Sequence, residues 1–120
     1  MTAAVECRAL ERGYGSLEVL RGLDMEVGAG SIYGLLGPSG CGKTTLLKVL
    51  LGRLVPWGGT ALALGSAPGE PGAPVPGPAV GYAPQELALY EDLSIGETLR
   101  FHGRLQLLEP AQVAQREAWL

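Results

Sequence analysis

The stretch GPSGCGKTT, residues 37–45, decides the fold expected for this chain. It fits the pattern G-x-x-x-x-G-K-[ST], with Gly37, Gly42, Lys43 and Thr44 at the fixed positions. Glycine tolerates positive φ and has no Cβ, so the backbone can curl and bring its N–H groups close to phosphate oxygens. The lysine ammonium suits the β- and γ-phosphates, and the hydroxyl that follows it can coordinate Mg²⁺. The pattern therefore predicts a phosphate-binding loop, and a glycine-rich turn that binds nothing is the alternative.

The residues on either side of the loop support this interpretation. The apolar run 32–36 predicts a buried strand before the loop. Helix formers over Thr45–Leu54 predict a helix after it, which Pro56 would end. Phosphates bound in the loop would then lie at a helix N-terminus, where the helix dipole favours anions.

The composition restricts the class of protein. The chain has 120 residues, 47% of them hydrophobic, which excludes a wholly disordered chain. A net charge of −3 gives no electrostatic footprint for nucleic acid, so no nucleic-acid partner is expected. No apolar run reaches the roughly 18 residues of a membrane span, and the first residues do not resemble a signal peptide, so we expect a soluble, cytoplasmic chain.

The chain has two cysteines, Cys7 and Cys41, too few for a disulfide framework or a metal cluster. Cys41 lies inside the loop, where we interpret it as a tolerated variable position, with a redox switch as the alternative.

Upstream of the loop, the sequence predicts two strands. Residues 3–10 alternate loosely, and residues 19–27 alternate clearly from Leu23 as a half-buried antiparallel strand does. The glycines of residues 12–16 predict a turn between them, which carries the exposed aromatic Tyr14.

Downstream, residues 60–64 and 80–83 predict short strands, separated by an irregular loop rich in proline and glycine over residues 65–78. Ser94 and Glu97 have the spacing of a capping box and predict a helix to about Leu108. Pro110 suits the first turn of a further helix. The order of elements predicts an α/β domain with an antiparallel edge and a helical part that begins near Ser94.

Three features together resemble the nucleotide-binding domain of ABC transporters: Tyr14 ahead of the loop, the loop itself, and GYAPQELALYEDLSIGETL, residues 81–99, with a glutamine just after a strand. The segment PQELALYEDLSIGETLRF, residues 84–101, looks most like the ABCG and ABCH type of exporter. The resemblance implies a P-loop NTPase core of the ABC ATPase type, with antiparallel edge strands, that stops at the start of the helical subdomain. Its expected division is residues 1–93, the N-terminal part of the ATP-binding core, and residues 94–120, the beginning of the helical subdomain.

The resemblance also implies ATP and Mg²⁺ as ligands and a role for each matching residue. Tyr14 would stack on the adenine, with a surface turn tyrosine as the alternative. Gln85 would reach Mg²⁺ and the attacking water, with a polar strand terminus as the alternative, and residues 86–93 would dock the transmembrane domain. Lys43 would also be catalytic, and Thr44 would also be a metal ligand. The loop residues expected to contact the phosphates are Gly37, Pro38, Ser39, Gly40, Cys41, Gly42, Lys43, Thr44 and Thr45.

His102 lies inside the helix expected after Ser94, and we interpret it as a helix-surface or packing residue. ATP hydrolysis in the family also needs an Asp-Glu strand end, a signature motif and a switch histidine, and these do not occur in the sequence. We therefore expect the N-terminal part of a domain that works as a head-to-tail dimer on the cytoplasmic face of a membrane and couples ATP hydrolysis to export.

By itself the chain is expected to bind ATP weakly and to hydrolyse essentially none. Two alternatives remain open. One is a non-catalytic nucleotide-binding module that docks on a full-length transporter subunit. The other is a small P-loop kinase, which would need lid arginines, for which only Arg100, Arg104 and Arg116 are candidates.

Overall fold

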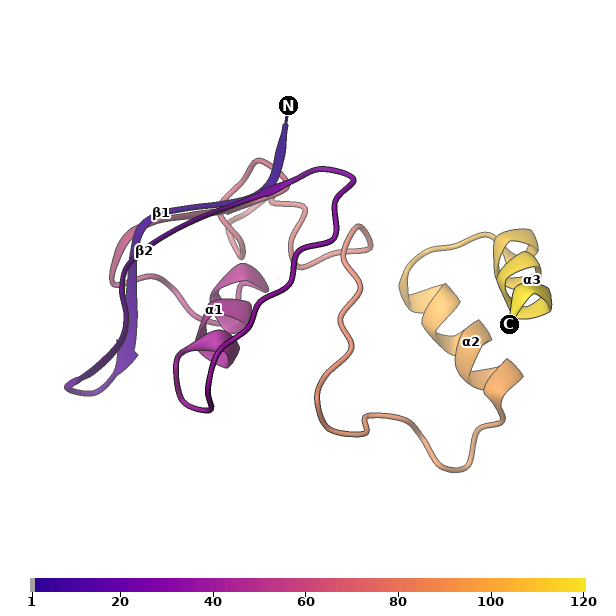
Figure 1. The fold of residues 1–120 in the computed structure, drawn as a ribbon. Coiled ribbons are helices and arrows are strands. Elements are labelled where there is room, and N and C mark those ends of the chain that lie inside the picture. The colour runs from indigo at the N-terminus through magenta and orange to yellow at the C-terminus, as the bar shows by residue number, and fades with distance from the viewer. Residues whose placement is uncertain (1) are drawn as a thin grey trace. The chain divides into compact units, whose positions relative to one another are not determined.

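The computed structural model describes residues 2–120 and divides the chain into two compact units, one ending at Pro76 and the other spanning Gly77–Leu120. The first unit contains a three-stranded antiparallel sheet in the order β2-β1-β3. Its strands are β1 (Ala3–Tyr14), β2 (Leu17–Gly28) and β3 (Gly58–Ala63). β1 and β2 form a long hairpin (Figure 1).

The hairpin confirms the two strands predicted upstream of the loop and makes both of them longer. β1 continues through residues that the glycines had indicated as a turn, and Tyr14 still pairs with Leu17. The turn itself is therefore confined to Gly15 and Ser16, where Gly15 takes a left-handed φ of 57°. Tyr14 consequently lies at the end of a regular strand, where the ladder restricts its backbone.

The core of the first unit lies between this sheet and the helix α1 (Lys43–Leu50). Leu46 and Val49 are 2% and 1% exposed. Full burial of a side chain of this kind contributes roughly 1.5–3 kcal/mol. The buried residues of the cluster are Cys7, Leu10, Leu20, Leu46, Val49 and Ala61.

The helix ends earlier than predicted. It stops at Leu50 and not at Leu54, because Gly52 takes a left-handed φ of 77°. The N–H of Gly52 donates to the carbonyl of Val49 at 3.0 Å, and the N–H of Arg53 to that of Lys48 at 2.8 Å. The glycine therefore terminates the helix before Pro56 is reached.

Two of the predicted strands are wrong. Residues 32–36 and 80–83 have no strand partner among the residues that the structure describes, and Ile32 and Leu36 are almost fully exposed. An apolar run becomes a buried strand only where neighbouring strands satisfy its backbone groups on both sides. The β2-β1-β3 sheet does not extend to either run.

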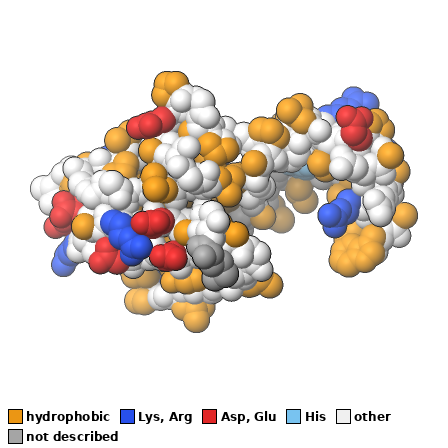
Figure 2. Space-filling model, turned by 90° about the horizontal axis from the view of Figure 1, so that it is seen from above, with side chains coloured by type: hydrophobic (Ala, Val, Ile, Leu, Met, Phe, Trp, Pro, Cys, Tyr) orange, Lys and Arg blue, Asp and Glu red, His pale blue; other side chains and the backbone are white. Residues whose placement is uncertain are grey.

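Hydrophobic side chains reach the surface in many places (Figure 2).

The predicted irregular loop, residues 65–78, contains no helix or strand, but it is partly ordered by its own packing. Val75 is 2% exposed, and its carbonyl accepts from the N–H of Gly69 at 2.8 Å. The short strand predicted at 60–64 is confirmed up to Ala63, the end of β3, and Leu64 begins the turn that follows.

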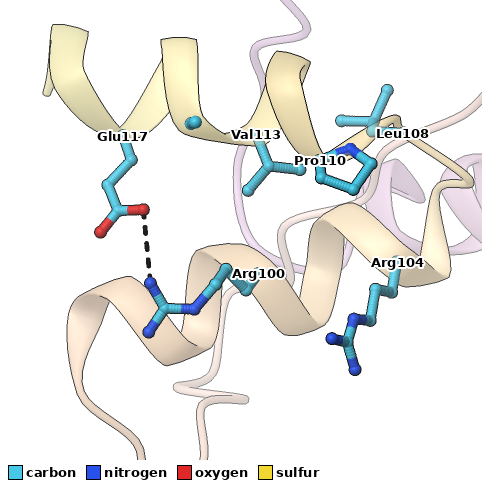
Figure 3. A pocket seen from close by; sticks show the side chains of 7 residues that line it. Arg100, Arg104, Leu108, Pro110, Val113 and Glu117 are labelled. Atoms are coloured by element: carbon cyan, nitrogen blue, oxygen red, sulfur yellow. Dashed lines mark hydrogen bonds and ion pairs between the residues drawn. The ribbon is translucent and has the colours of Figure 1, made fainter.

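The second unit contains two helices, α2 (Ile95–Leu105) and α3 (Pro110–Trp119), both of them predicted. They pack where Gly103 faces Val113: a Cβ on Gly103 would lie 2.4 Å from Val113 Cγ2. Arg100 donates to Glu117 at 3.5 Å across the two helices (Figure 3). A close contact between glycine and valine and one exposed ion pair therefore join the two helices.

The capping box predicted at the start of α2 is confirmed. The N–H of Glu97 donates to the Ser94 hydroxyl at 3.1 Å, and the N–H of Ser94 donates to the Glu97 carboxylate at 3.2 Å. The hydrogen bond from the Ser94 N–H, and after it the interaction with the Ser94 side chain, lowers the pKa of the Glu97 carboxyl because both stabilise its charged form.

Replacement of Ser94 by alanine is expected to destabilise the start of α2 by about 1 kcal/mol, because the N–H of Glu97 loses its acceptor. Backbone amides of the first turn should then exchange with solvent about fivefold faster in native-state hydrogen exchange. Ser16→Ala is the control, since Ser16 is exposed in the hairpin turn. Unchanged exchange in the Ser94 variant would contradict a stabilising role for the box.

Candidate functional site

The phosphate loop has a conformation that requires its glycines. Gly40 and Gly42 take left-handed φ values of 80° and 108°. A Cβ on Gly37 would lie 2.6 Å from Cys41 Sγ. A Cβ on Gly42 would lie 2.9 Å from a methyl group of Leu20. Any other residue at Gly40 or Gly42 would therefore strain the curl of the backbone, whereas at Gly37 the Cys41 side chain would have to move.

The loop presents backbone donors at the start of α1. The first hydrogen bond of the helix runs from the N–H of Leu46 to the carbonyl of Gly42, at 2.9 Å. The N–H groups of Lys43, Thr44 and Thr45 precede that bond, and no side chain caps them. These donors, together with the positive end of the helix dipole, form an arrangement suited to an anion.

Lys43 points back over the loop. Its ammonium donates to the carbonyl oxygens of Gly37 and Pro38, the latter at 2.9 Å, and lies 3.7 Å from Cys41 Sγ. The positive charge is thus held directly beside the backbone donors of the loop. An incoming phosphate oxygen can replace these carbonyls as the partner of the ammonium.

The two threonines after Lys43 face different surroundings. Thr44 is exposed, so its hydroxyl is accessible to a ligand or a metal ion. Thr45 is buried, and its hydroxyl lies 3.2 Å from the Tyr14 hydroxyl. The fold therefore brings Tyr14 to the same helix start as the phosphate loop, although 31 positions separate it from Thr45 in the sequence.

The sequence did not indicate which residues of the sheet pack against the loop. Val19 and Leu20 of β2 lie against Gly42, at 3.0 and 2.9 Å from the position of a Cβ. The only signal available was the alternation of β2, which marks buried positions without saying what they contact.

The other residues considered from the sequence belong to the second unit. Gln85 is exposed in the irregular segment before α2. His102 is exposed on α2, with its ring 5.3 Å from that of Phe101, in agreement with a helix-surface residue. The hollow between α2 and α3, drawn in Figure 3, includes none of the predicted site residues.

The described part of the chain, residues 2–120, contains no group of three His, Cys, Asp or Glu side chains placed to hold a metal ion. Within the same residues, no helix has both the length and the hydropathy that crossing a bilayer requires.

The two cysteines differ in accessibility. Cys7 is fully buried in the core, and burial raises the pKa of its thiol, so it stays protonated. Cys41 is exposed beside the Lys43 ammonium. Only Cys41 therefore offers its sulfur to reagents from solvent.

Comparison with known families shows which protein family the chain and its phosphate loop belong to. Residues 20–120, which include the whole phosphate loop, match the family described as ABC transporter. The chain belongs to the ABC transporter family.

Relatives within the ABC transporter family match most of the chain. ABC transporter G family member 20 of Dictyostelium discoideum is 44% identical over 98 residues, which cover 82% of this chain and 13% of that protein. Nod factor export ATP-binding protein I of Cupriavidus metallidurans is 43% identical over 116 residues, which cover 97% of this chain and 38% of that protein. The chain therefore spans between about an eighth and two fifths of these relatives.

A solved structure described as the ATP binding subunit of an ABC transporter superimposes with a TM-score of 0.76 at 28% identity, over 94% of this chain and 47% of that one. The predicted fold class, an ABC-type P-loop ATPase core with antiparallel edge strands, is therefore confirmed. ABC ATPases generally bind ATP with Mg²⁺, and they generally pair with transmembrane domains and dimerise. ABC ATPase domains are generally associated with the cytoplasmic side of a membrane.

We expect maleimide to label Cys41 at least about tenfold faster than Cys7, because the first thiol is exposed and the second is buried. Peptide mapping by mass spectrometry measures both sites in one sample, so each cysteine is the control for the other. Mg-ATP should slow labelling of Cys41 and leave Cys7 unchanged. Equal labelling of both thiols in the folded chain would contradict the described core.

Proposed function

We propose that residues 37–45 bind the phosphates of ATP together with Mg²⁺. The observation that carries this proposal is the set of uncapped N–H groups at the start of α1, with the Lys43 ammonium held beside them. The glycine positions fit the same ligand, since a backbone without Cβ atoms lets phosphate oxygens approach the amides.

Each residue of the loop has a role in this proposal. The N–H groups from Ser39 to Thr45 donate to phosphate oxygens, with Gly37 and Pro38 shaping the turn and Cys41 contributing only its backbone. Lys43 exchanges the carbonyls that it now contacts for oxygens of the β- and γ-phosphates. Thr44, exposed at the helix start, supplies a hydroxyl to Mg²⁺. The ring of Tyr14, a residue that is 43% exposed, stacks on the adenine.

Gln85 is proposed to orient the water that attacks the γ-phosphate and to contact Mg²⁺. A side-chain amide can both donate and accept, so it can orient water without adding charge. This role rests on the position of Gln85 in the sequence pattern, and the residue is exposed.

The segment after Gln85 is proposed to bind the transmembrane domain. It forms, with α2, an open apolar hollow of about 430 Å³. Leu87 and Ile95, which line it, are 95% and 80% exposed. Such a surface suits an apolar partner that leaves the polar residues at the rim in water. The lining residues are Leu87, Leu89, Tyr90, Glu91, Leu93, Ile95, Thr98 and Leu99.

The whole protein is proposed to couple ATP binding and hydrolysis to transport across a membrane, with export as the direction implied by the ABCG-like segment. Residues 1–93 would supply the ATP-binding core and residues 94–120 the start of the helical subdomain, with a second nucleotide-binding domain facing the loop head to tail. A non-catalytic module that docks on a full-length subunit is the alternative. Co-purification of the chain with an intact transporter subunit, without ATP turnover, would favour that alternative.

Lys43→Ala tests the binding of ATP. The variant is expected to bind Mg-ATP at least about tenfold more weakly in isothermal titration calorimetry, because a charge-assisted hydrogen bond to phosphate is lost. Lys48→Ala removes the same charge from the last turn of α1 and is the matched control. Equal affinity in the two variants would contradict the role of Lys43. A folded wild-type chain that gave no heat at millimolar Mg-ATP would overturn the proposed function.

Thr44→Ala tests the metal contact. ATP affinity measured with Mg²⁺ should fall by about three- to tenfold, whereas affinity measured in EDTA should stay within about twofold, because only the metal-dependent part of binding uses the hydroxyl. Thr44→Ser keeps the hydroxyl and should recover the Mg²⁺ dependence. Equal losses with and without Mg²⁺ would show that Thr44 acts on the loop and not on the metal.

A further inference from the structure

Thr45 belongs to the phosphate loop, but its side chain is buried. The residue is 5% exposed, whereas the neighbouring Thr44 is exposed. A buried hydroxyl needs a hydrogen-bond partner. Its partner is the Tyr14 hydroxyl at 3.2 Å, and either oxygen can be the donor.

The Tyr14 ring is anchored at one end and open at the other. Tyr14 is the last residue of β1, where the hairpin ladder fixes its backbone through the pair with Leu17. The residue is still 43% exposed, so the phenol is held by its hydroxyl while part of the ring faces solvent. A phenylalanine at the same position would keep the ring and lose the anchor.

A second contact fixes the distance between the hairpin and the loop. Val19 and Leu20, on the strand paired with β1, lie against Gly42 with no room for a Cβ. The hydroxyl pair and this backbone contact lie within one helical turn of each other, at Gly42 and Thr45. Two contacts, and not one, therefore set where the Tyr14 ring lies relative to the N–H groups of the loop.

We propose that the hydroxyl pair Tyr14–Thr45 is a positioning contact that holds the aromatic ring in place for the base of the bound nucleotide. Thr45 then acts through its side chain on recognition of the base and through its backbone N–H on the phosphates. Because the ring is already ordered, less rotamer freedom is lost when the base binds. This inference rests on the proposed function of the loop.

The test compares a ligand that has a base with one that has none. Mg-ATP and inorganic tripolyphosphate with Mg²⁺ are titrated calorimetrically into the wild-type chain, Tyr14→Phe, Thr45→Val and the double variant. Each single variant should weaken ATP binding by roughly three- to tenfold, the effect of one net hydrogen bond, and leave tripolyphosphate within about twofold. The double variant should lose no more than either single variant, because both remove the same contact.

Two further measurements separate this role from a merely structural one. Thermal unfolding without nucleotide identifies any variant that is not folded at the temperature of the titration. Thr45→Ser keeps the hydroxyl and should recover the ATP affinity that Thr45→Val loses.

Three results would overturn the inference while leaving ATP binding by the loop intact. They are wild-type ATP affinity in Tyr14→Phe, equal losses of ATP and tripolyphosphate in Thr45→Val, and losses that multiply in the double variant. A folded wild-type chain that binds neither ligand would overturn the proposed function together with this inference.

Discussion

The absence of a side chain at Gly42 is the constraint on which the rest of the site depends. Its left-handed φ of 108° lets the chain enter α1 directly from the loop, and the missing Cβ lets Val19 and Leu20 of the hairpin approach the backbone. The same contact continues into the core through Leu20 and Leu46. Hydrophobic packing of one small sheet against one short helix therefore holds the start of that helix in place, and with it the donors that the helix presents.

The electrostatics of the loop depend on that placement. No side chain caps the first N–H groups of α1, and the loop residues 37–41 that precede them are exposed, so the donors lie next to solvent. The Lys43 ammonium is held meanwhile by carbonyls of its own loop, and within residues 2–120 no carboxylate forms an ion pair with it. The Lys43 ammonium and the N–H groups at the start of α1 thus place their positive charge side by side. Such a site suits the negative charge of a polyphosphate, in agreement with membership of the ABC transporter family.

Local patterns predicted those elements in which residues a few positions apart supply one another's hydrogen-bond partners. The Ser94–Glu97 capping box is an example, since both of its hydrogen bonds join residues three apart. The apolar run 32–36 shows the opposite case. Its composition is that of a buried strand, but a strand depends on partners elsewhere in the chain, and the described sheet does not extend to it. The helix predicted to extend to Leu54 ends early for a second reason, because the left-handed Gly52 outweighs the helix propensity of Arg53 and Leu54.

The sequence by itself predicted a phosphate-binding loop and with it the family, because the spacing of Gly37, Gly42, Lys43 and Thr44 is typical of few other structures. It also determined the hairpin, through the alternation along β2. Only the tertiary structure decided that Tyr14 meets Thr45, and that adjacent threonines face opposite surroundings. Contacts between residues 31 positions apart depend on how the sheet packs on the helix, and no local pattern in the sequence records that packing.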